Sequence, residues 1–271
     1  MKNHKNIVFV LLIVIVVAGA KATAKFQAQK SETGAEQNLT GSEKKSQMTA
    51  KELDDAATPV VDLISSYTAA VSTDRWLKNN RYDNEGILKT EIDPSIAEII
   101  WEPTEHISDI PAGESDLVVE GRVTDSAAFL SNDKGAAYSE LTVHVSDVLK
   151  GTPDLNVKTG DSIVTERFGG RVKYPNGQIV RYRIVGQGSP EKGKTYLFFL
   201  SRADESNYRI LTAYELQGNK VQALDGSRIN NRRLGDWAFD KHNDEDYQGF
   251  RKTVEQAVKN PHTGKPKRFN P

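Results

Sequence analysis

The middle of the chain alternates between apolar and polar residues with a period of two, which is the pattern of half-buried strands. The alternation is clearest in residues 117–124 and 141–146. Shorter runs follow in residues 163–168, 179–185, 208–216 and 221–224. Residues 196–200 are apolar throughout, which predicts a central strand covered on both faces. Glycine-containing turn signals separate the runs, so the pattern predicts a small antiparallel barrel or sandwich.

Two segments before this block have helical spacing. Thr58-Pro59 has the form of an N-cap followed by proline at the first helical position, which predicts a helix to about Ser72. Its apolar residues would be Val60, Ile64, Tyr67 and Val71. Asp93-Pro94 opens a second short helical candidate, with apolar residues Ile96, Ile99 and Ile100. Both would flank the β-block.

A third helix is predicted at the C-terminal end. Asn243-Asp244 would cap it, and it would run to Asn260-Pro261. Its apolar residues, Tyr247, Phe250, Val254 and Ala257, share one helical face. The expected fold class is therefore mainly β with flanking helices, in which an amphipathic C-terminal helix packs on the barrel.

The first twenty residues have the pattern of an export signal. Lys2 and Lys5 precede the apolar run at residues 7–18, and residues 18–20 provide an A-x-A cleavage site, with a second at residues 22–24. A retained membrane anchor is the alternative, although about 14 apolar residues are fewer than the roughly 20 of a spanning helix. In either case we expect the rest of the chain to lie outside the cytoplasm, secreted or tethered to the cell membrane.

These patterns divide the chain into six parts. Residues 1–20 are a signal peptide or N-terminal membrane anchor, 21–51 a disordered linker, 52–114 a partly helical segment, 115–225 the β-barrel domain, 226–260 a loop and the C-terminal helix, and 261–271 a disordered basic tail.

Composition excludes several chemistries. The 271 residues include 36 Lys or Arg, 37 Asp or Glu and no cysteine. Disulfides, thiolate metal sites, a cysteine nucleophile and a lipoprotein anchor are therefore excluded. Because several of the cations lie in the leader and the tail, the body of the chain is acidic, which argues against nucleic acid as a partner.

The β-block resembles a module of secreted bacterial proteins. The resemblance lies in SDLVVEGRV at 115–123, VSDVLKG at 145–151, Gly160-Asp161, Gly169-Gly170-Arg171 and GKTYLFFL at 193–200. In layout the block is also similar to the OB-like barrel of netrin and metalloproteinase-inhibitor domains. Those inhibitors act through an N-terminal cysteine that is absent here, so the resemblance implies an OB-like fold and does not imply inhibition.

One group of side chains could bind a metal. Glu102, Glu105, His106 and Asp109 would lie on one face of a helix, at spacings that suit oxygen and imidazole ligands. The alternative is an acidic loop before the first strand. No cofactor is expected.

A basic hairpin is the candidate site for an anionic ligand. Its cations are Arg167, Arg171, Lys173, Arg181 and Arg183. Asn176-Gly177 favours a two-residue type I′ turn, which would pair Lys173 with Val180 and Arg171 with Tyr182. Arg171 and Lys173 would then lie on one face, and Arg181 and Arg183 on the other. That register favours a solvated, two-sided hairpin over a concentrated basic patch.

Three further motifs each have two interpretations. Gly169-Gly170 is either a β-bulge or an anion-binding nest, and the bulge is favoured. Asp161 with Glu166, or Asp236 with Asp240, could act as acid and base in a hydrolase, although acidic pairs arise by chance in a chain this acidic. A set of aromatic residues could form a binding platform or anchor flanking segments to the core. The set is Trp76, Trp101, Trp237, Tyr82 and Phe239.

The sequence favours an exported, non-catalytic binding or interaction module of unknown ligand. Its partner would be an extracytoplasmic protein or an envelope polymer, and it would meet the membrane only through its N-terminal segment. The alternative is a secreted hydrolase that acts on cell-wall or extracellular polymers through acidic residues. A third hypothesis is an accessory protein that binds anionic polymers through the hairpin or the basic tail.

Overall fold

The larger of two β-sheets has six strands. The computed structural model describes residues 58–83, 97–101, 107–226 and 238–261. The strands of this sheet are β3 (Leu117–Leu130), β4 (Ala137–Lys150), β5 (Ser162–Phe168), β8 (Thr195–Arg202), β9 (Asn207–Gln217) and β10 (Lys220–Ala223). Their order is β10-β9-β5-β4-β3-β8, and β8 also pairs with β9. Only the β5–β9 pair among these is parallel. The predicted mainly β fold with antiparallel strands is confirmed.

Both faces of this sheet are covered by apolar packing. One cluster includes Val119, Val143 and Phe198, which point to the same side from β3, β4 and β8. A second cluster on the other side contains Leu197 and Phe199. Because residues 196–200 of β8 are all at most 1% exposed, the predicted doubly covered strand is confirmed.

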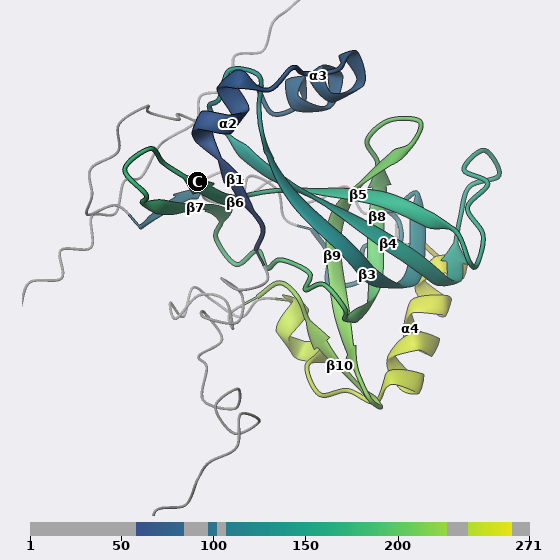
Figure 1. Cartoon of the computed structure of the whole chain (residues 1–271). Coiled ribbons are helices and arrows are strands. Elements are labelled where there is room, and N and C mark those ends of the chain that lie inside the picture. Colours follow the sequence, from purple (N-terminus) through teal and green to yellow (C-terminus); the bar gives the residue numbers. More distant parts are fainter. Residues whose placement is uncertain (1–57, 84–96, 102–106, 227–237, 262–271) are drawn as a thin grey trace, which may run out of the picture.

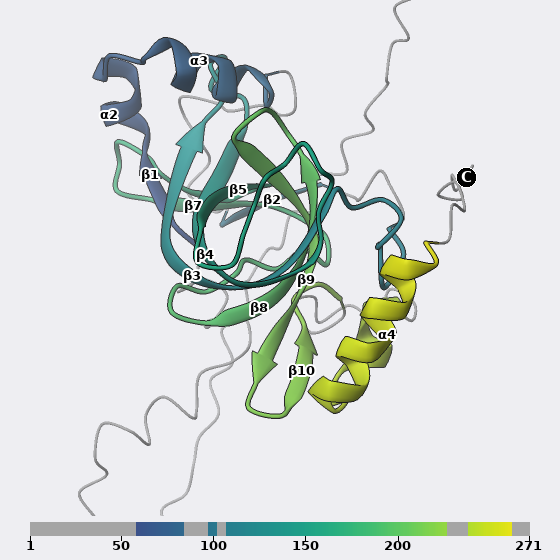
Figure 2. The same ribbon diagram turned by 90° about the vertical axis from the view of Figure 1, so that its right-hand side faces the viewer.

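The C-terminal helix forms as predicted and supplies part of the second cluster. Helix α4 (Tyr247–Lys259) lies beside β10 (Figure 2). Its Phe250 and Val254 are buried in the second cluster. A short 3-10 helix, η3 (Ala238–His242), precedes it. The cap is Asp246, whose carboxylate accepts from Gly249 N, so the expected cap at Asn243-Asp244 is wrong by two residues. Asn243 instead accepts a hydrogen bond from Ala223 N and fixes β10.

The smaller sheet is built from segments distant in sequence. Its strands are β1 (Val60–Asp62), β2 (Glu98–Trp101), β6 (Gly170–Lys173) and β7 (Ile179–Ile184), in the order β1-β6-β7-β2. β1 pairs with β6 and β2 with β7 in parallel, while β6 and β7 form an antiparallel hairpin. One face buries Val172, Val180 and Tyr182 against Leu130 and Ala137 at the ends of β3 and β4.

The predicted N-terminal helices are corrected by this sheet. Residues 60–62 form a strand, and the helix from Thr58 to Ser72 is replaced by α2 (Leu63–Thr68) and α3 (Thr73–Asn80). Asp62 and Ser72 cap these helices through their side chains. Residues 98–101 are a strand as well, so the second helical candidate is wrong over that range, and its start at 93–96 lies outside the described residues. The β-branched pairs Val60-Val61 and Ile99-Ile100 fit a pleated strand better than a helix.

The register of the basic hairpin also differs from the prediction by one residue. Arg171 pairs with Arg181 and Lys173 with Ile179. Tyr174 N donates to Gln178 O at 2.8 Å and Gly177 N donates to Tyr174 O at 2.9 Å, which makes a three-residue loop. Gly177 has a φ of 84°. Pro175 lacks the N–H of a paired strand residue but fits the second position of a type I turn, so it belongs to the loop.

Several predicted parts lie outside the described residues, namely the signal or anchor at 1–20, the linker at 21–51 and all but Pro261 of the basic tail. Among the described residues, no helix is both long and apolar enough to cross a membrane.

Candidate functional site

The corrected register places the hairpin cations together. Because directly paired residues point to the same side, Arg171, Lys173, Arg181 and Arg183 share one face of the smaller sheet. The predicted division of these charges between two faces is therefore wrong. The shared face is nevertheless not an open basic patch, since Arg181 and Arg183 are only 5% and 9% exposed.

Hydrogen bonds occupy three of the five predicted anion-binding cations, and burial restricts access to a fourth, Arg181. Arg167 is buried and its Nη2 donates to both oxygens of Asp225, at 2.6 and 2.7 Å. Arg171 Nε donates to Thr58 O at 2.8 Å, and Arg183 Nη2 donates to Glu98 at 3.3 Å. Burial, with a smaller effect from Arg183, lowers the pKa of Arg181 to about 10.

Lys173 is the fifth cation of the hairpin. It is exposed, and its Nζ lies 3.6 Å from a carboxylate oxygen of Asp62. It is thus the hairpin cation most open to an external anion. One lysine of the five predicted cations does not make the predicted anion site.

The predicted metal ligands are tested at one position only. Glu102, Glu105 and His106 lie outside the described residues. Asp109 lies in a non-helical stretch and accepts from His242 Nε2 at 2.7 Å and from Lys241 at 2.5 Å. Burial acts to raise the pKa of Asp109, but these hydrogen bonds outweigh burial and lower it. Within the described residues, no group of three His, Asp or Glu side chains could hold a metal ion.

The remaining predicted motifs are dispersed. Gly169 has a φ of 103°, and a Cβ there would lie 2.7 Å from Tyr182 O, so a glycine is required where the chain passes from β5 to β6. Asp161 is exposed in a turn and accepts from Lys158 N. Glu166 is buried farther along β5, and Asp236 lies outside the described residues. The arrangement therefore does not bring the first carboxylate pair into one cleft.

The aromatic set is dispersed as well. Trp76 is 49% exposed on α3, Tyr82 is buried beside Tyr138, and Phe239 packs in the second core cluster. The side chain of Trp101 and all of Trp237 lie outside the described residues. Of the described members, only Trp76 is available to a partner.

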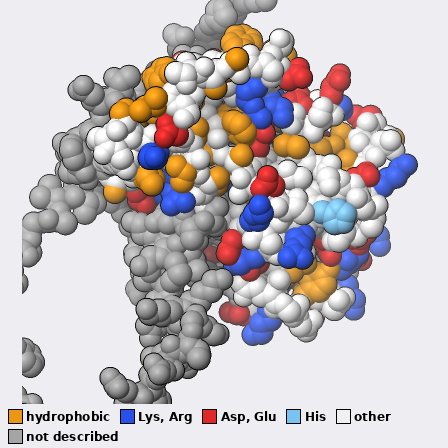
Figure 3. Space-filling view, viewed as in Figure 1, with side chains coloured by type: hydrophobic (Ala, Val, Ile, Leu, Met, Phe, Trp, Pro, Cys, Tyr) orange, Lys and Arg blue, Asp and Glu red, His pale blue; other side chains and the backbone are white. Residues whose placement is uncertain are grey.

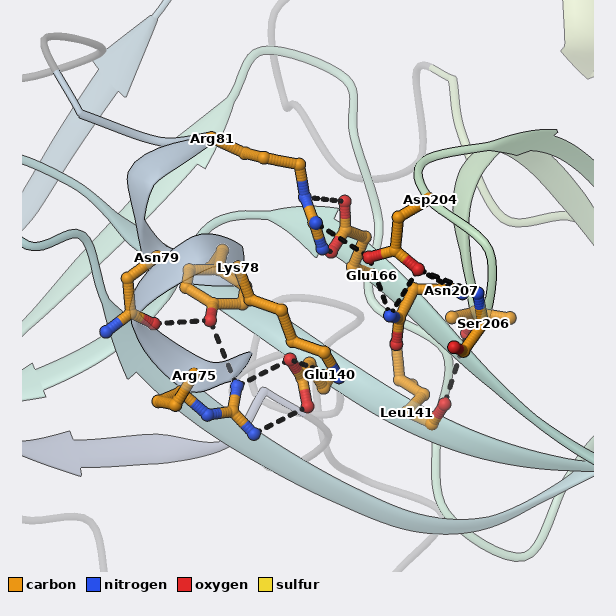
Figure 4. Close-up of polar contacts among 12 residues, drawn as sticks. Arg75, Lys78, Asn79, Arg81, Glu140, Leu141, Glu166, Asp204, Ser206 and Asn207 are labelled. Atoms are coloured by element: carbon orange, nitrogen blue, oxygen red, sulfur yellow. Dashed lines mark hydrogen bonds and ion pairs between the residues drawn. The ribbon is translucent and has the colours of Figure 1, made fainter. Parts of the chain in front are cut away.

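The sequence predicts a helix and places two aromatic residues in the segment before the larger sheet, but it does not single out the charged residues by which this segment contacts the sheet. We call residues 58–83, which comprise β1, α2 and α3, the strap. Helix α3 lies across β4 and β5 (Figure 4), and Arg75 forms two hydrogen bonds to the carboxylate of Glu140, at 2.5 and 3.1 Å. The same guanidinium donates to Tyr138 Oη at 3.0 Å and lies 3.6 Å from the centre of the Phe129 ring.

Arg81 fixes the other end of α3. Its Nε donates to Glu166 at 3.0 Å, its Nη2 makes a second contact with the same carboxylate, and its Nη1 donates to Asp204 at 2.8 Å. Burial tends to raise the pKa of Asp204, but hydrogen bonds from Ser206 N, Asn207 and Arg81 lower it overall. Asp204 therefore stays charged at neutral pH.

The two carboxylates that Arg75 and Arg81 bind are neighbours in the sheet. Glu140 and Glu166 are direct partners in the β4–β5 register, so two like charges face each other across the pair. Such a pair is unfavourable without compensating cations. Arg75 and Arg81 supply that compensation, with Lys78 Nζ 3.6 Å from Glu140.

The strap carries most of the exposed large hydrophobic side chains of the described residues. Seven large hydrophobic side chains of the described residues are exposed, and six lie between residues 60 and 77. These six are Val60, Ile64, Tyr67, Val71, Trp76 and Leu77, and the seventh is Ile179 on the hairpin. Hydrophobic side chains accordingly gather over the part of the surface formed by α2, α3 and β1 (Figure 3).

A cavity of about 420 Å³ opens beside these residues. It is lined by residues 60–62 of β1, by both strap helices and by residues 128–130 of β3. Its polar lining includes Asp62, Arg75 and Lys134. Burial lowers the pKa of Lys134, partly offset by Asp83 and Asp133. The volume lies within the usual range for ligand pockets.

No protein-family model and no curated protein matches this chain.

Proposed function

We propose that this chain is an exported, non-catalytic binding module whose strap contacts the apolar surface of an extracytoplasmic protein. The gathering of six exposed large hydrophobic side chains within residues 60–77 carries this proposal. Contiguous exposed apolar surface costs solubility and is typical of interaction sites. An apolar surface with two aromatic residues, Tyr67 and Trp76, suits a protein partner better than a charged envelope polymer.

The scaffold of the proposed module is an OB-like barrel. Support comes from the pairings of β3 with β4, β4 with β5, β5 with β9, β9 with β8 and β8 with β3, which return to their starting strand. Full closure removes exposed strand edges, which favours a stable monomeric support for a binding segment.

The acidic residues support binding over hydrolysis. Glu166 is bound to Arg81, and Asp225 accepts from Arg167, Thr212 and the Gly188 N–H. The lone pairs of these carboxylates are occupied by their donors, so the carboxylates are poorly placed to exchange protons with a substrate. The hydrolase alternative has no comparable observation in its favour.

Export to the outside of the membrane is part of the proposal. The apolar run at 7–18 behind Lys2 and Lys5 and the absence of cysteine support it. In this proposal the chain meets the membrane only through residues 1–20 and binds no nucleic acid.

Site-specific photo-crosslinking in the bacterium that makes the protein would test this function. A photoreactive amino acid replaces Leu77 in the full-length chain, and the matched control replaces Ile179, which is also exposed but lies on the hairpin. We expect a discrete protein adduct from position 77 and none from position 179. Equal adducts at both positions, adducts of lipid or polysaccharide alone, or no adduct at 77 would overturn the proposal.

A further inference from the structure

The cavity beside the strap has apolar walls that come from separate elements. The apolar side chains that line it are those of Val60 and Val61 on β1, Val71 between α2 and α3, and Phe129 and Leu130 on β3. Its volume of about 420 Å³ lies toward the lower end of the range of about 300–1,000 Å³ for ligand pockets. Because moving an apolar group from water to such walls is favourable, the cavity suits a small ligand with an apolar body.

The side-chain amide of Asn79 is a hydrogen-bond donor that the strap leaves unused. Asn79 lines the cavity and is only 4% exposed. Its Oδ1 accepts from Tyr138 Oη at 2.7 Å, and its nitrogen points away from that contact (Figure 4). Within the described part of the chain, no group accepts a hydrogen bond from this nitrogen. Donors on buried side chains normally have acceptors, so an acceptor on a ligand in the cavity would satisfy this one.

Lys134 brings a positive charge to the same cavity. It lies in the turn between β3 and β4 with a φ of 58°, a left-handed backbone conformation that lysine rarely adopts. Its Nζ lies 5.9 Å from the centre of the Tyr67 ring, and among the described residues it forms no ion pair. Burial lowers the pKa of Lys134, and the more distant charges of Asp83 and Asp133 offset burial only in part. An anionic ligand would compensate the ammonium group at this position.

The other two charged side chains of the cavity lining already have partners. Asp62 caps α2 with its carboxylate and lies 3.6 Å from Lys173 Nζ. Arg75 uses both terminal nitrogens to bind the carboxylate of Glu140. Lys134 is therefore the charge of the lining that is left for a ligand, and it favours an anion over a cation. One lysine balances one negative charge, which suits a carboxylate better than a phosphate group with nearly two.

We propose that this cavity binds a small monocarboxylate with an apolar body. Lys134 compensates the charge of the carboxylate, the amide of Asn79 donates a hydrogen bond to the ligand, and the walls from β1 and β3 contact its apolar body. Hydrogen bonds to a charged group are stronger than those between neutral groups, so the site favours a carboxylate over an alcohol with the same body. The ligand is a small molecule and not a protein, so this inference goes beyond the function proposed above. Leu77, the crosslinking position of that proposal, does not line the cavity.

Isothermal titration calorimetry of the full-length chain with sodium octanoate tests this site. The matched probes are 1-octanol and octylammonium chloride, which have the same alkyl chain with no charge and with a positive charge. We expect one octanoate to bind per chain, about tenfold more tightly than either matched probe. Octanoate that does not bind saturably, or a matched probe that binds as tightly as octanoate, would overturn the proposal.

Two pairs of variants test where octanoate binds. Lys134→Gln should weaken its binding about tenfold, because the ammonium group is lost. Lys192→Gln removes an exposed lysine that pairs with Asp125, and it should leave binding unchanged. Ala70→Trp should abolish binding by filling the cavity, whereas Ala127→Trp should not, because Ala127 is exposed on β3 and does not line the cavity. Binding that survives Lys134→Gln or Ala70→Trp at full strength would contradict the proposed site.

NMR spectra of the wild-type chain cover the case in which a variant fails to fold. Octanoate should shift the side-chain NH₂ signals of Asn79 and the backbone amide signals of residues 129–134. The amide signals of α4, which does not line the cavity, should stay in place. Unchanged Asn79 signals at saturating octanoate, or shifts confined to residues away from the cavity, would refute binding at this site.

Discussion

The carboxylate of Asp225 accepts four hydrogen bonds, two from Arg167 and one each from Thr212 Oγ1 and Gly188 N. We predict that Asp225→Ala lowers the free energy of unfolding by about 3–5 kcal/mol, because Arg167 is then a buried charge without its carboxylate. Urea unfolding of the full-length chain measures this difference. Asp125→Ala is the control, since it breaks the exposed pair with Lys192 and should change the unfolding curve little. Equal effects of the two substitutions would contradict the prediction.

Individual side chains are where prediction from the sequence was least successful. Arg167 looks like a surface cation because its strand is short and bordered by glycines, but its partner lies 58 residues away. The need of Glu166 for a cationic partner was predictable, since an acid within a run of strand residues needs a cation if it is buried. The sequence does not indicate that Arg81, which is 85 residues from Glu166, provides that cation.

At the scale of elements, the stability of the hairpin loop and of β6 depends on single glycines with constrained backbone angles. Gly169 and Gly177 both have positive φ angles, of 103° and 84°. A Cβ at Gly177 meets no atom within 4 Å, whereas one at Gly169 would lie 2.7 Å from Tyr182 O. We predict that Gly177→Ala costs about 1 kcal/mol of stability from backbone strain alone. Gly169→Ala should cost clearly more because β6 must also move. Chemical denaturation of both variants tests this order, and a larger loss for Gly177→Ala would refute it.

The same hairpin shows why elements are easier to predict than their register. Asn176-Gly177 correctly indicates a turn, but Pro175 adds one residue to the loop and shifts every pair by one position. That shift moves Arg181 onto the face of Arg171. In the strap, the helical spacing correctly indicates a helix at Ile64 and Tyr67 but starts it too early, because pairing with β6 stabilises residues 60–62 as a strand.

At the scale of the whole molecule, local patterns account for the mainly β fold and the C-terminal helix. The alternation in β3 and β4 and the amphipathic face of α4 are properties of continuous segments. The smaller sheet could not be predicted in this way, because β1 and β2 join the hairpin through parallel pairings more than 80 residues apart in sequence. The candidate site depends on that same long-range placement, since the strap contacts β4 and β5 (Figure 1) through pairs that are 65 and 85 residues apart in sequence.

Export, which we propose for the whole chain, is a premise of the proposed function. An apolar run of about 14 residues spans roughly 21 Å as a helix, less than the roughly 30 Å hydrocarbon core, so cleavage is favoured over retention. We predict that the protein isolated from its bacterium is found outside the cytoplasm and begins at Lys21, after Ala18-Gly19-Ala20. N-terminal sequencing of the native protein measures this directly. A mutant with Ala18→Leu and Ala20→Leu should no longer begin at Lys21, and cleavage after the second A-x-A at residues 22–24 would give a chain that begins at Lys25. An intact Met1 on the wild-type protein in the membrane fraction would instead establish a retained anchor, and its recovery from the cytoplasm would remove the basis for an extracytoplasmic partner.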